Sequence, residues 1–186
     1  HFYKHNLKSG KKVKISKEHG THGVTPSASG KYFIDSYSST DVARNVDVMD
    51  ANGKFVKRLH EADDPLKEYN IGTIELGTLK AEDGQTLYTR MIKPYNFDPN
   101  KKYPVIIYVY GGPHAQLITD EWTAGAGIYL HYLSQEGFIV FSLDNRGSAD
   151  RGEAFEQVIH RQCGQAEMRD QKVGIDYLKS LPYVDA

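Results

Sequence analysis

The sequence contains little of what membrane-spanning, disulfide-rich or nucleic-acid-binding proteins need. It has one cysteine, Cys163, so it forms neither an internal disulfide nor a four-cysteine zinc site. The longest apolar runs, Val105–Tyr110 and Phe138–Leu143, have six residues each, whereas a membrane-spanning helix takes about 20. The 23 Lys and Arg residues are balanced by 24 Asp and Glu residues, so no strong field attracts nucleic acid. We expect no membrane span and no nucleic-acid binding from these residues.

The composition that is present favours a folded protein. Hydrophobic residues make up 39% of the chain and charged residues 25%, and 13 Tyr with 7 Phe exclude a disordered chain. The 186 residues suffice for one full domain or two partial ones. Because the first residue is His1 rather than Met, and the chain opens in a predicted strand, Phe2–Leu7, we expect a piece of a longer protein. Its localisation is therefore unknown from the sequence.

Residues 1 to about 60 have the pattern of short antiparallel strands. Turn signals such as Ser27–Lys31 and Asp50–Lys54 separate runs that are rich in β-branched and aromatic residues. With Phe2–Leu7, these runs predict a four-stranded antiparallel meander; they are Tyr32–Ser38, Asn45–Asp50 and Phe55–Leu59. Such a sheet is typical of one β-propeller blade, and a single blade cannot cover both of its own faces. Neighbouring blades are therefore expected elsewhere.

After a polar connector, His60–Tyr69, the pattern changes, and we place the domain boundary between residues 68 and 69. Thr73–Lys80 and Thr86–Lys93 flank an Asp-Gly turn signal and predict a second hairpin. The apolar runs Tyr103–Tyr110 and Phe138–Leu143 predict strands buried on both faces, joined by a parallel crossover. Helices are expected at residues 121–134, 152–160 and 165–179. Residues 71–186 thus predict the first part of a doubly wound α/β domain.

Two loops carry the candidate site. The first, Tyr110–His114, follows the first buried strand, and the second, Leu143–Ser148, follows the next. Because ligands bind at the carboxyl ends of strands in open α/β sheets, we expect the two loops to be neighbours at a functional edge. A Tyr at a strand end can direct its hydroxyl at a developing oxyanion, and two glycines leave the backbone accessible. The alternative is a tight turn with a structural Tyr.

Other chemistry-bearing residues favour structural roles. Asp144 and Arg146 either orient loops around a site or form a salt-bridged turn, and we favour the turn. Ser148 is not expected to be a nucleophile, because Gly-x-Ser-x-Gly is absent from the whole sequence. His19 and His22 resemble a metal pair, but an intervening glycine and the lack of a third ligand favour loop histidines.

The remaining histidines and the cysteine give weaker signals. His114 could approach a substrate from the glycine loop, whereas packing or solvated roles are expected for His60, His131 and His160. Cys163 has no activating base nearby in the sequence, which disfavours a catalytic thiol. No Gly-x-Gly-x-x-Gly or phosphate-loop lysine motif occurs, so no dinucleotide or nucleotide cofactor is expected.

Three motifs follow one another in the second part of the sequence: Tyr110–Pro113, Asp144–Ser148, and Gly164 with Glu167 and Asp170-Gln171. Four further motifs precede them: Gly20–His22, Ser29–Phe33, Ser36–Ser39 and Asp50–Lys54. In this order and spacing they resemble the prolyl oligopeptidase clan and, more narrowly, its dipeptidyl peptidase IV branch. The resemblance covers nearly the whole chain.

The resemblance implies a partial α/β-hydrolase domain at residues 69–186, preceded at residues 1–68 by the last blade of an antiparallel β-propeller. It implies a serine exopeptidase that removes N-terminal dipeptides, Xaa-Pro or Xaa-Ala, from peptides, although some relatives remove tripeptides. In that family a Ser is activated by a His that an Asp orients, and a backbone N–H and a Tyr hydroxyl hold the oxyanion. Among these groups, only Tyr110 carries over to this sequence.

The resemblance implies that the remaining functional groups lie outside this sequence. The Ser, Asp and His are expected after Ala186, and the glutamates that bind the substrate amine are expected in an earlier propeller segment. We therefore expect this chain alone to be inactive and to need the rest of its polypeptide. Expected partners are peptide substrates and, for the whole protein, a second copy in a homodimer. No cofactor and no metal are expected, and kinship favours a periplasmic, secreted or membrane-anchored protein.

Two alternatives stay open. The glycine-loop motif is shared with acylaminoacyl peptidases and prolyl endopeptidases, which the amine-binding glutamates would distinguish. A non-catalytic family member that kept the fold as a binding module is the other alternative, and the residue at the downstream nucleophile position would decide it.

Overall fold

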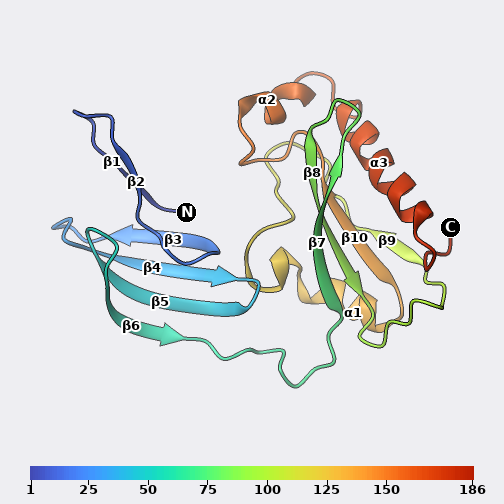
Figure 1. Ribbon diagram of the computed structural model, residues 1–186, viewed down its shortest axis with the longest axis horizontal. Helices are drawn as coiled ribbons and strands as arrows, with labels where there is room; N and C mark the ends of the chain where they lie inside the picture. The colour runs from blue at the N-terminus through green and yellow to red at the C-terminus, as the bar shows by residue number, and fades with distance from the viewer. The chain divides into compact units, whose positions relative to one another are not determined.

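The computed structural model describes every residue from His1 to Ala186 (Figure 1). The chain divides into two units, of which the first contains residues 1–68 together with residues 119–125. The second unit contains residues 69–118 and 126–186. The sequence pattern did not assign residues 119–125 to the first unit.

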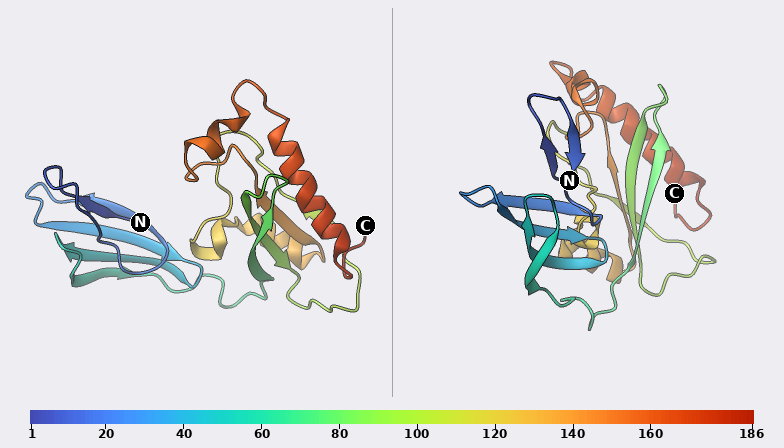
Figure 2. Two further views of the ribbon diagram at one scale, coloured as in Figure 1. Left: turned by 45° about the horizontal axis from the view of Figure 1, so that its top comes forward. Right: turned by 60° about the vertical axis from the view of Figure 1, so that its left-hand side comes forward.

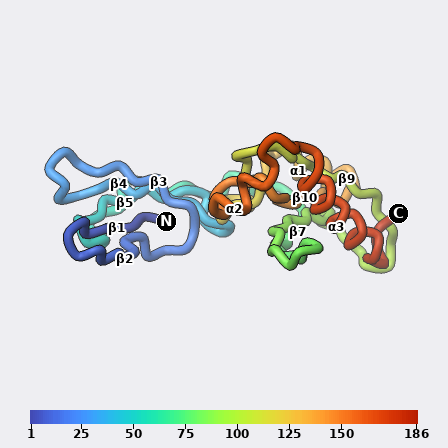
Figure 3. Tube along the Cα trace, turned by 90° about the horizontal axis from the view of Figure 1, so that it is seen from above, coloured from blue at the N-terminus to red at the C-terminus, as the bar shows by residue number.

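The first unit contains a four-stranded antiparallel sheet in the order β3-β4-β5-β6, whose strands lie side by side (Figure 3). These strands are β3 (Thr21–Pro26), β4 (Tyr32–Ser39), β5 (Val42–Asp50) and β6 (Phe55–Glu61). In β4 the side chains of Phe33, Asp35 and Tyr37 are buried while Tyr32 and Ile34 are exposed, which is the alternation of a sheet with one covered face.

The predicted meander is correct in strand number but wrong in its first strand. Phe2–Leu7 does not join the four-stranded sheet; its central part, β1 (Tyr3–His5), pairs instead with β2 (Lys12–Lys14) in a separate hairpin. The first strand of the meander is β3, which pairs with β4 from Thr21 opposite Ser38 to Pro26 opposite Phe33. Glycines and a terminal proline gave this segment a loop-like sequence, and its strand conformation depends on pairing with β4.

The second unit contains a four-stranded sheet in the order β7-β8-β10-β9. The hairpin of β7 (Thr73–Lys80) and β8 (Thr86–Lys93) has the predicted bounds, and β8 pairs antiparallel with β10 (Ile139–Asp144). β9 (Val105–Ile107) pairs parallel with β10, which confirms the predicted crossover. However, β9 is shorter than expected and lies half-buried at the end of this sheet, whereas β10 is buried along its whole length.

Helices cover the sheet of the second unit on two sides. Val140 packs with Leu130 of α1 (Ile128–Gln135), and the next residue, Phe141, belongs to a separate core cluster with Leu178 of α3 (Ala166–Ser180). Because successive strand residues point to opposite faces, α1 and α3 lie on opposite faces of β10. Figure 2 shows α3 running along the sheet. A short α-helix, α2 (Glu153–Glu156), and a 3₁₀-helix, η2 (Gln157–Ile159), precede α3.

The helix predicted for residues 121–134 is only partly correct. Residues Trp122–Gly125 form a tight turn, η1, in which Thr123 (φ 59°) and Ala124 (φ 53°) have left-handed backbone, and the α-helix begins only at Ile128. Gly125 and Gly127 explain the late start, since glycine disfavours a helix interior. The helix predicted for 165–179 agrees with α3 to within one residue at each end. No helix in the chain combines the length and apolar character needed to cross a membrane.

Candidate functional site

The loop of residues 110–114, here called the Tyr110 loop, begins three residues after β9 ends at Ile107. The Tyr108 N–H donates to the Phe141 carbonyl at 2.8 Å and so extends the pairing of β9 with β10. Beyond this point the side chain of Tyr110 is 61% exposed. Gly111 has a φ of 73°, and a Cβ at Gly112 would lie 3.0 Å from the Tyr110 ring. The glycines therefore allow the chain to turn back beneath the tyrosine ring.

The second loop, residues 144–148, lies next to the first, as the sequence predicted. The backbone N–H of His114 donates to the Gly147 carbonyl at 3.2 Å, and the Gly147 N–H donates to the Phe155 carbonyl at 3.0 Å. The imidazole Nδ1 of His114 contacts the Glu156 carboxylate. No local pattern in the sequence indicates Glu156, which is 42 residues away from His114 in the chain.

Arg146 and Asn145 fasten the second loop to α3. Arg146 binds the Asp170 carboxylate through its guanidinium, at 2.8 to 3.1 Å, and through its backbone N–H at 2.8 Å. The bonds to Asp170 raise the pKa of Arg146 above its ordinary value, so it stays charged. Asn145 accepts a 2.9 Å bond from Gln171. The structure thus gives Arg146 a structural ion pair, but with Asp170 and Asp83 and not in the salt-bridged turn with Asp144 that the sequence favoured.

A buried Asp144 and a buried Arg90 hold the chain that follows the Tyr110 loop. Asp144 accepts the N–H groups of Leu117 and Ile118 at 2.8 and 3.1 Å, and Arg90 donates to the Leu117 carbonyl at 2.7 Å. Burial raises the pKa of Asp144 although these bonds and the charge of Arg90 oppose it, and burial lowers the pKa of Arg90. Arg90 was not predicted as part of this region, because its only signal in the sequence is a charge inside a predicted strand.

Neither Ser148 nor Cys163 is placed as a nucleophile. Ser148 is buried, and its hydroxyl donates to the Asn145 carbonyl at 2.7 Å. Cys163 is exposed, and its thiol contacts the Ile159 carbonyl at 3.6 Å, with no base against it.

The histidine pair of the first unit does not form a metal site. His22 is buried in β3, where it contacts Asp35 at 2.9 Å and the Glu18 carbonyl at 3.0 Å, so its prediction as a loop histidine is wrong. His19 is exposed and lies 3.0 Å from Asp120, which raises its pKa. No group of three or more potential metal-ligating side chains occurs in the chain.

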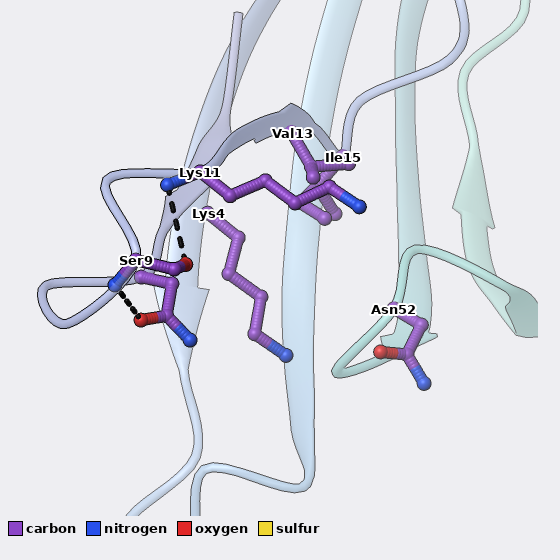
Figure 4. A pocket seen from close by; sticks show the side chains of 7 residues that line it. Lys4, Ser9, Lys11, Val13, Ile15 and Asn52 are labelled. Carbon is purple, nitrogen blue, oxygen red and sulfur yellow. Dashed lines mark hydrogen bonds between the residues drawn. The ribbon is translucent and has the colours of Figure 1, made fainter.

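Two open hollows occur in the first unit, and neither contains Tyr110. One has a volume of about 450 Å³ and lies between β3, β4 and residues 121–122. The other, about 310 Å³, is shown in Figure 4, where Lys4 and Lys11 extend from the β1–β2 hairpin and Asn52 lies on the turn before β6. Its lining contains amines, amides and a hydroxyl but no carboxylate; the lining residues are Lys4, Asn6, Ser9, Lys11, Val13, Ile15 and Asn52.

Comparison with known proteins places these features in a family. Residues 127–186 match the model of the prolyl oligopeptidase family. The chain is 30% identical over 181 residues to dipeptidyl peptidase 8 of Mus musculus, an alignment that covers 92% of this chain and 20% of that protein. It is 33% identical over 165 residues to a probable dipeptidyl peptidase 4 of Aspergillus fumigatus, covering 86% of this chain and 21% of that protein.

Two solved structures match almost the whole chain. A putative dipeptidyl aminopeptidase IV from Bacteroides ovatus superimposes with a TM-score of 0.93 at 45% identity, covering 98% of this chain and 26% of that one. Porphyromonas gingivalis dipeptidyl peptidase 4 gives a TM-score of 0.89 at 32% identity, covering 99% of this chain and 26% of that one.

These findings confirm the family resemblance that the sequence motifs indicated: the chain belongs to the prolyl oligopeptidase family and is of the dipeptidyl peptidase IV type. It spans about a fifth of the length of these curated relatives and about a quarter of these solved chains.

Proposed function

We propose that this chain contributes Tyr110 to the oxyanion hole of a serine exopeptidase that releases Xaa-Pro or Xaa-Ala dipeptides from the N-terminus of peptides. In this proposal residues 1–68 are the last blade of a β-propeller, and residues 69–186 are the first half of an α/β-hydrolase domain. The Ser, Asp and His of the triad come from other parts of the whole protein. The family similarity supports the type of reaction, and the position of Tyr110 supports its role.

The observation that carries the proposal is the exposed Tyr110, three residues beyond the end of β9. Attack of a serine hydroxyl on the scissile carbonyl converts the carbonyl oxygen into an oxyanion, which hydrogen-bond donors stabilise when they are already in place. Tyr110 is 61% exposed and its ring lies against Gly112, so the residue is accessible to a substrate. The buried pair Asp144 and Arg90 and the bond from Tyr108 hold the chain on either side.

Replacement of the tyrosine hydroxyl tests the proposal. In the whole protein, Tyr110→Phe should lower kcat for an Xaa-Pro-anilide by about 10²- to 10³-fold, the usual loss for one oxyanion donor. Steady-state kinetics measures the change, with Tyr95→Phe as the control because Tyr95 is also exposed but lies outside the loop. An unchanged kcat in Tyr110→Phe would remove Tyr110 from the mechanism.

A further inference from the structure

The backbone of the Tyr110 loop ends in an uncommon conformation. His114 has a φ of 64°, in the left-handed region that residues other than glycine rarely adopt. Such residues persist only where the surrounding structure holds them, and they cluster at functional sites. His114 lies four residues after Tyr110, and the two glycines between them make the loop itself flexible. The position of Tyr110 therefore depends on how firmly His114 is held.

His114 is held by a closed circuit of contacts. Its N–H donates to the Gly147 carbonyl at 3.2 Å, and the Gly147 N–H donates to the Phe155 carbonyl at 3.0 Å. The His114 imidazole contacts the carboxylate of Glu156, the residue that follows Phe155. The side chain of His114 is thus attached to α2 directly, through Glu156, and its backbone is attached to α2 through Gly147.

The anchor of this circuit is rigid. Phe155 is buried in the core of the second unit, and Gly147 packs so closely against Ile159 that an added Cβ would lie 2.5 Å from its Cδ1. The residue before Gly147, Arg146, is bound to Asp170 of α3. These contacts therefore attach the end of the Tyr110 loop to the core of the second unit.

The geometry points to His114, held by Glu156, as a positioning residue that fixes the Tyr110 loop for oxyanion stabilisation. This inference rests on the proposed function of Tyr110. The His114 side chain is 77% exposed and the Glu156 side chain 25% exposed, and exposed ion pairs add little to stability. The pair is therefore expected to affect kcat far more than folding, because a misplacement of about 1 Å costs up to about 10²-fold in rate.

Kinetics of Glu156 variants in the whole protein test the inference. Glu156→Ala should lower kcat for an Xaa-Pro-anilide by about tenfold with KM changed by less than about twofold. Glu156→Gln keeps an acceptor oxygen and should recover most of the loss. Glu153→Ala is the matched control, because Glu153 is an exposed residue of the same short helix. A thermal melt of each variant checks the fold.

A second variant removes the other partner. His114→Asn keeps a residue type that tolerates left-handed backbone but removes the imidazole, so it should cause the same loss of kcat. A normal kcat in both His114→Asn and Glu156→Ala overturns the inference, while a loss in Tyr110→Phe under the same conditions leaves the proposed function standing.

The double variant separates positioning from other roles. If Glu156 acts through Tyr110, Glu156→Ala should change kcat by less than about twofold in a Tyr110→Phe background, since coupled residues are not additive. A full tenfold loss in that background overturns the inference, because Glu156 would then act elsewhere. An unchanged kcat in Tyr110→Phe alone overturns the proposed function and the inference with it.

Discussion

At the scale of single residues, His131 differs from every other histidine in the chain. It lies on α1 in the interior of the second unit with 1% of its surface exposed, and neither ring nitrogen has a hydrogen-bond partner. Burial lowers the pKa of His131, and the positive charge of Arg90 lowers it further. The sequence placed His131 among packing or solvated histidines, and the structure assigns it to packing.

The lowered pKa of His131 predicts that α1 loses stability in acid. In the unfolded chain a histidine takes up a proton below about pH 6.5. In the folded state His131 takes up a proton only when the pH falls below its lowered pKa. Stability is therefore fully present above about pH 6.5 and decreases below it, by at most about 1.4 kcal/mol per pH unit. Hydrogen exchange of α1 amides in the whole protein, corrected for intrinsic rates, should show this loss between pH 7.5 and 5.5.

His131→Leu should abolish the loss of protection, because it removes the titrating group from a buried apolar site. His160→Leu is the control, since His160 is exposed in the same unit. Equal acid sensitivity of α1 in His131→Leu and in the unaltered protein would show that another group is responsible.

At the scale of elements, a buried ion pair joins α3 to the loop after β10. Asp170 is 1% exposed, and all of its partners belong to Arg146, whose side chain is itself 10% exposed. A buried charge that loses its partner keeps the cost of its burial. α3 therefore holds the second loop through a pair whose two members depend on each other.

Asp170→Ala should lower the free energy of unfolding by about 3 to 5 kcal/mol, since it leaves Arg146 buried without its main partner. Urea unfolding of the whole protein, followed by a signal from the second unit, measures this change. Asp176→Ala provides the control on the same helix, because Asp176 makes only an exposed pair with Lys172 and its loss should change little. Similar effects of the two substitutions would contradict the role given to Asp170.

The sequence predicted correctly those helices and strands whose conformation follows from local signals, such as a turn motif or a regular spacing of apolar residues. The β7–β8 hairpin has an Asp-Gly turn and α3 has a sustained apolar period, and both were predicted nearly to the residue. β3 was missed because its strand conformation depends on pairing with β4. The neighbourhood of the two site loops followed from the strand order, whereas the contact of His114 with Glu156 joins distant segments and has no local signature. The role of Tyr110 stays a prediction.

At the scale of the whole molecule, the chain passes between its two units three times, after residues 68, 118 and 125. Residues 119–125 belong to the first unit, where the Trp122 N–H donates to the Ser38 hydroxyl at 2.8 Å and Asp120 contacts His19. This segment follows the residues that Asp144 and Arg90 hold. The Tyr110 loop is therefore followed, within a few residues of the chain, by a segment that packs in the first unit.

Trp122→Ala should loosen the first unit locally. Trp122 lines the hollow beside Ser36, Tyr37 and Ser38, so its loss removes packing against β4. We expect amide exchange in β4 to rise by about tenfold, equivalent to about 1.4 kcal/mol of local stability. Hydrogen-exchange mass spectrometry of the whole protein measures it, with Ile128→Ala as the control, because Ile128 is exposed just outside the segment. Unchanged exchange in β4 would show that the segment does not stabilise this unit.

The passage of residues 119–125 into the first unit also has a consequence for biosynthesis. A nascent chain that has been translated only to residue 68 contains all the strands of the first unit but not the segment that completes it. Residues 69–118, which belong to the second unit, must leave the ribosome first. Folding from the N-terminus, one domain after another, is the usual order during synthesis. Here the first unit lacks residues 119–125 until translation has passed through residues 69–118 of the second unit.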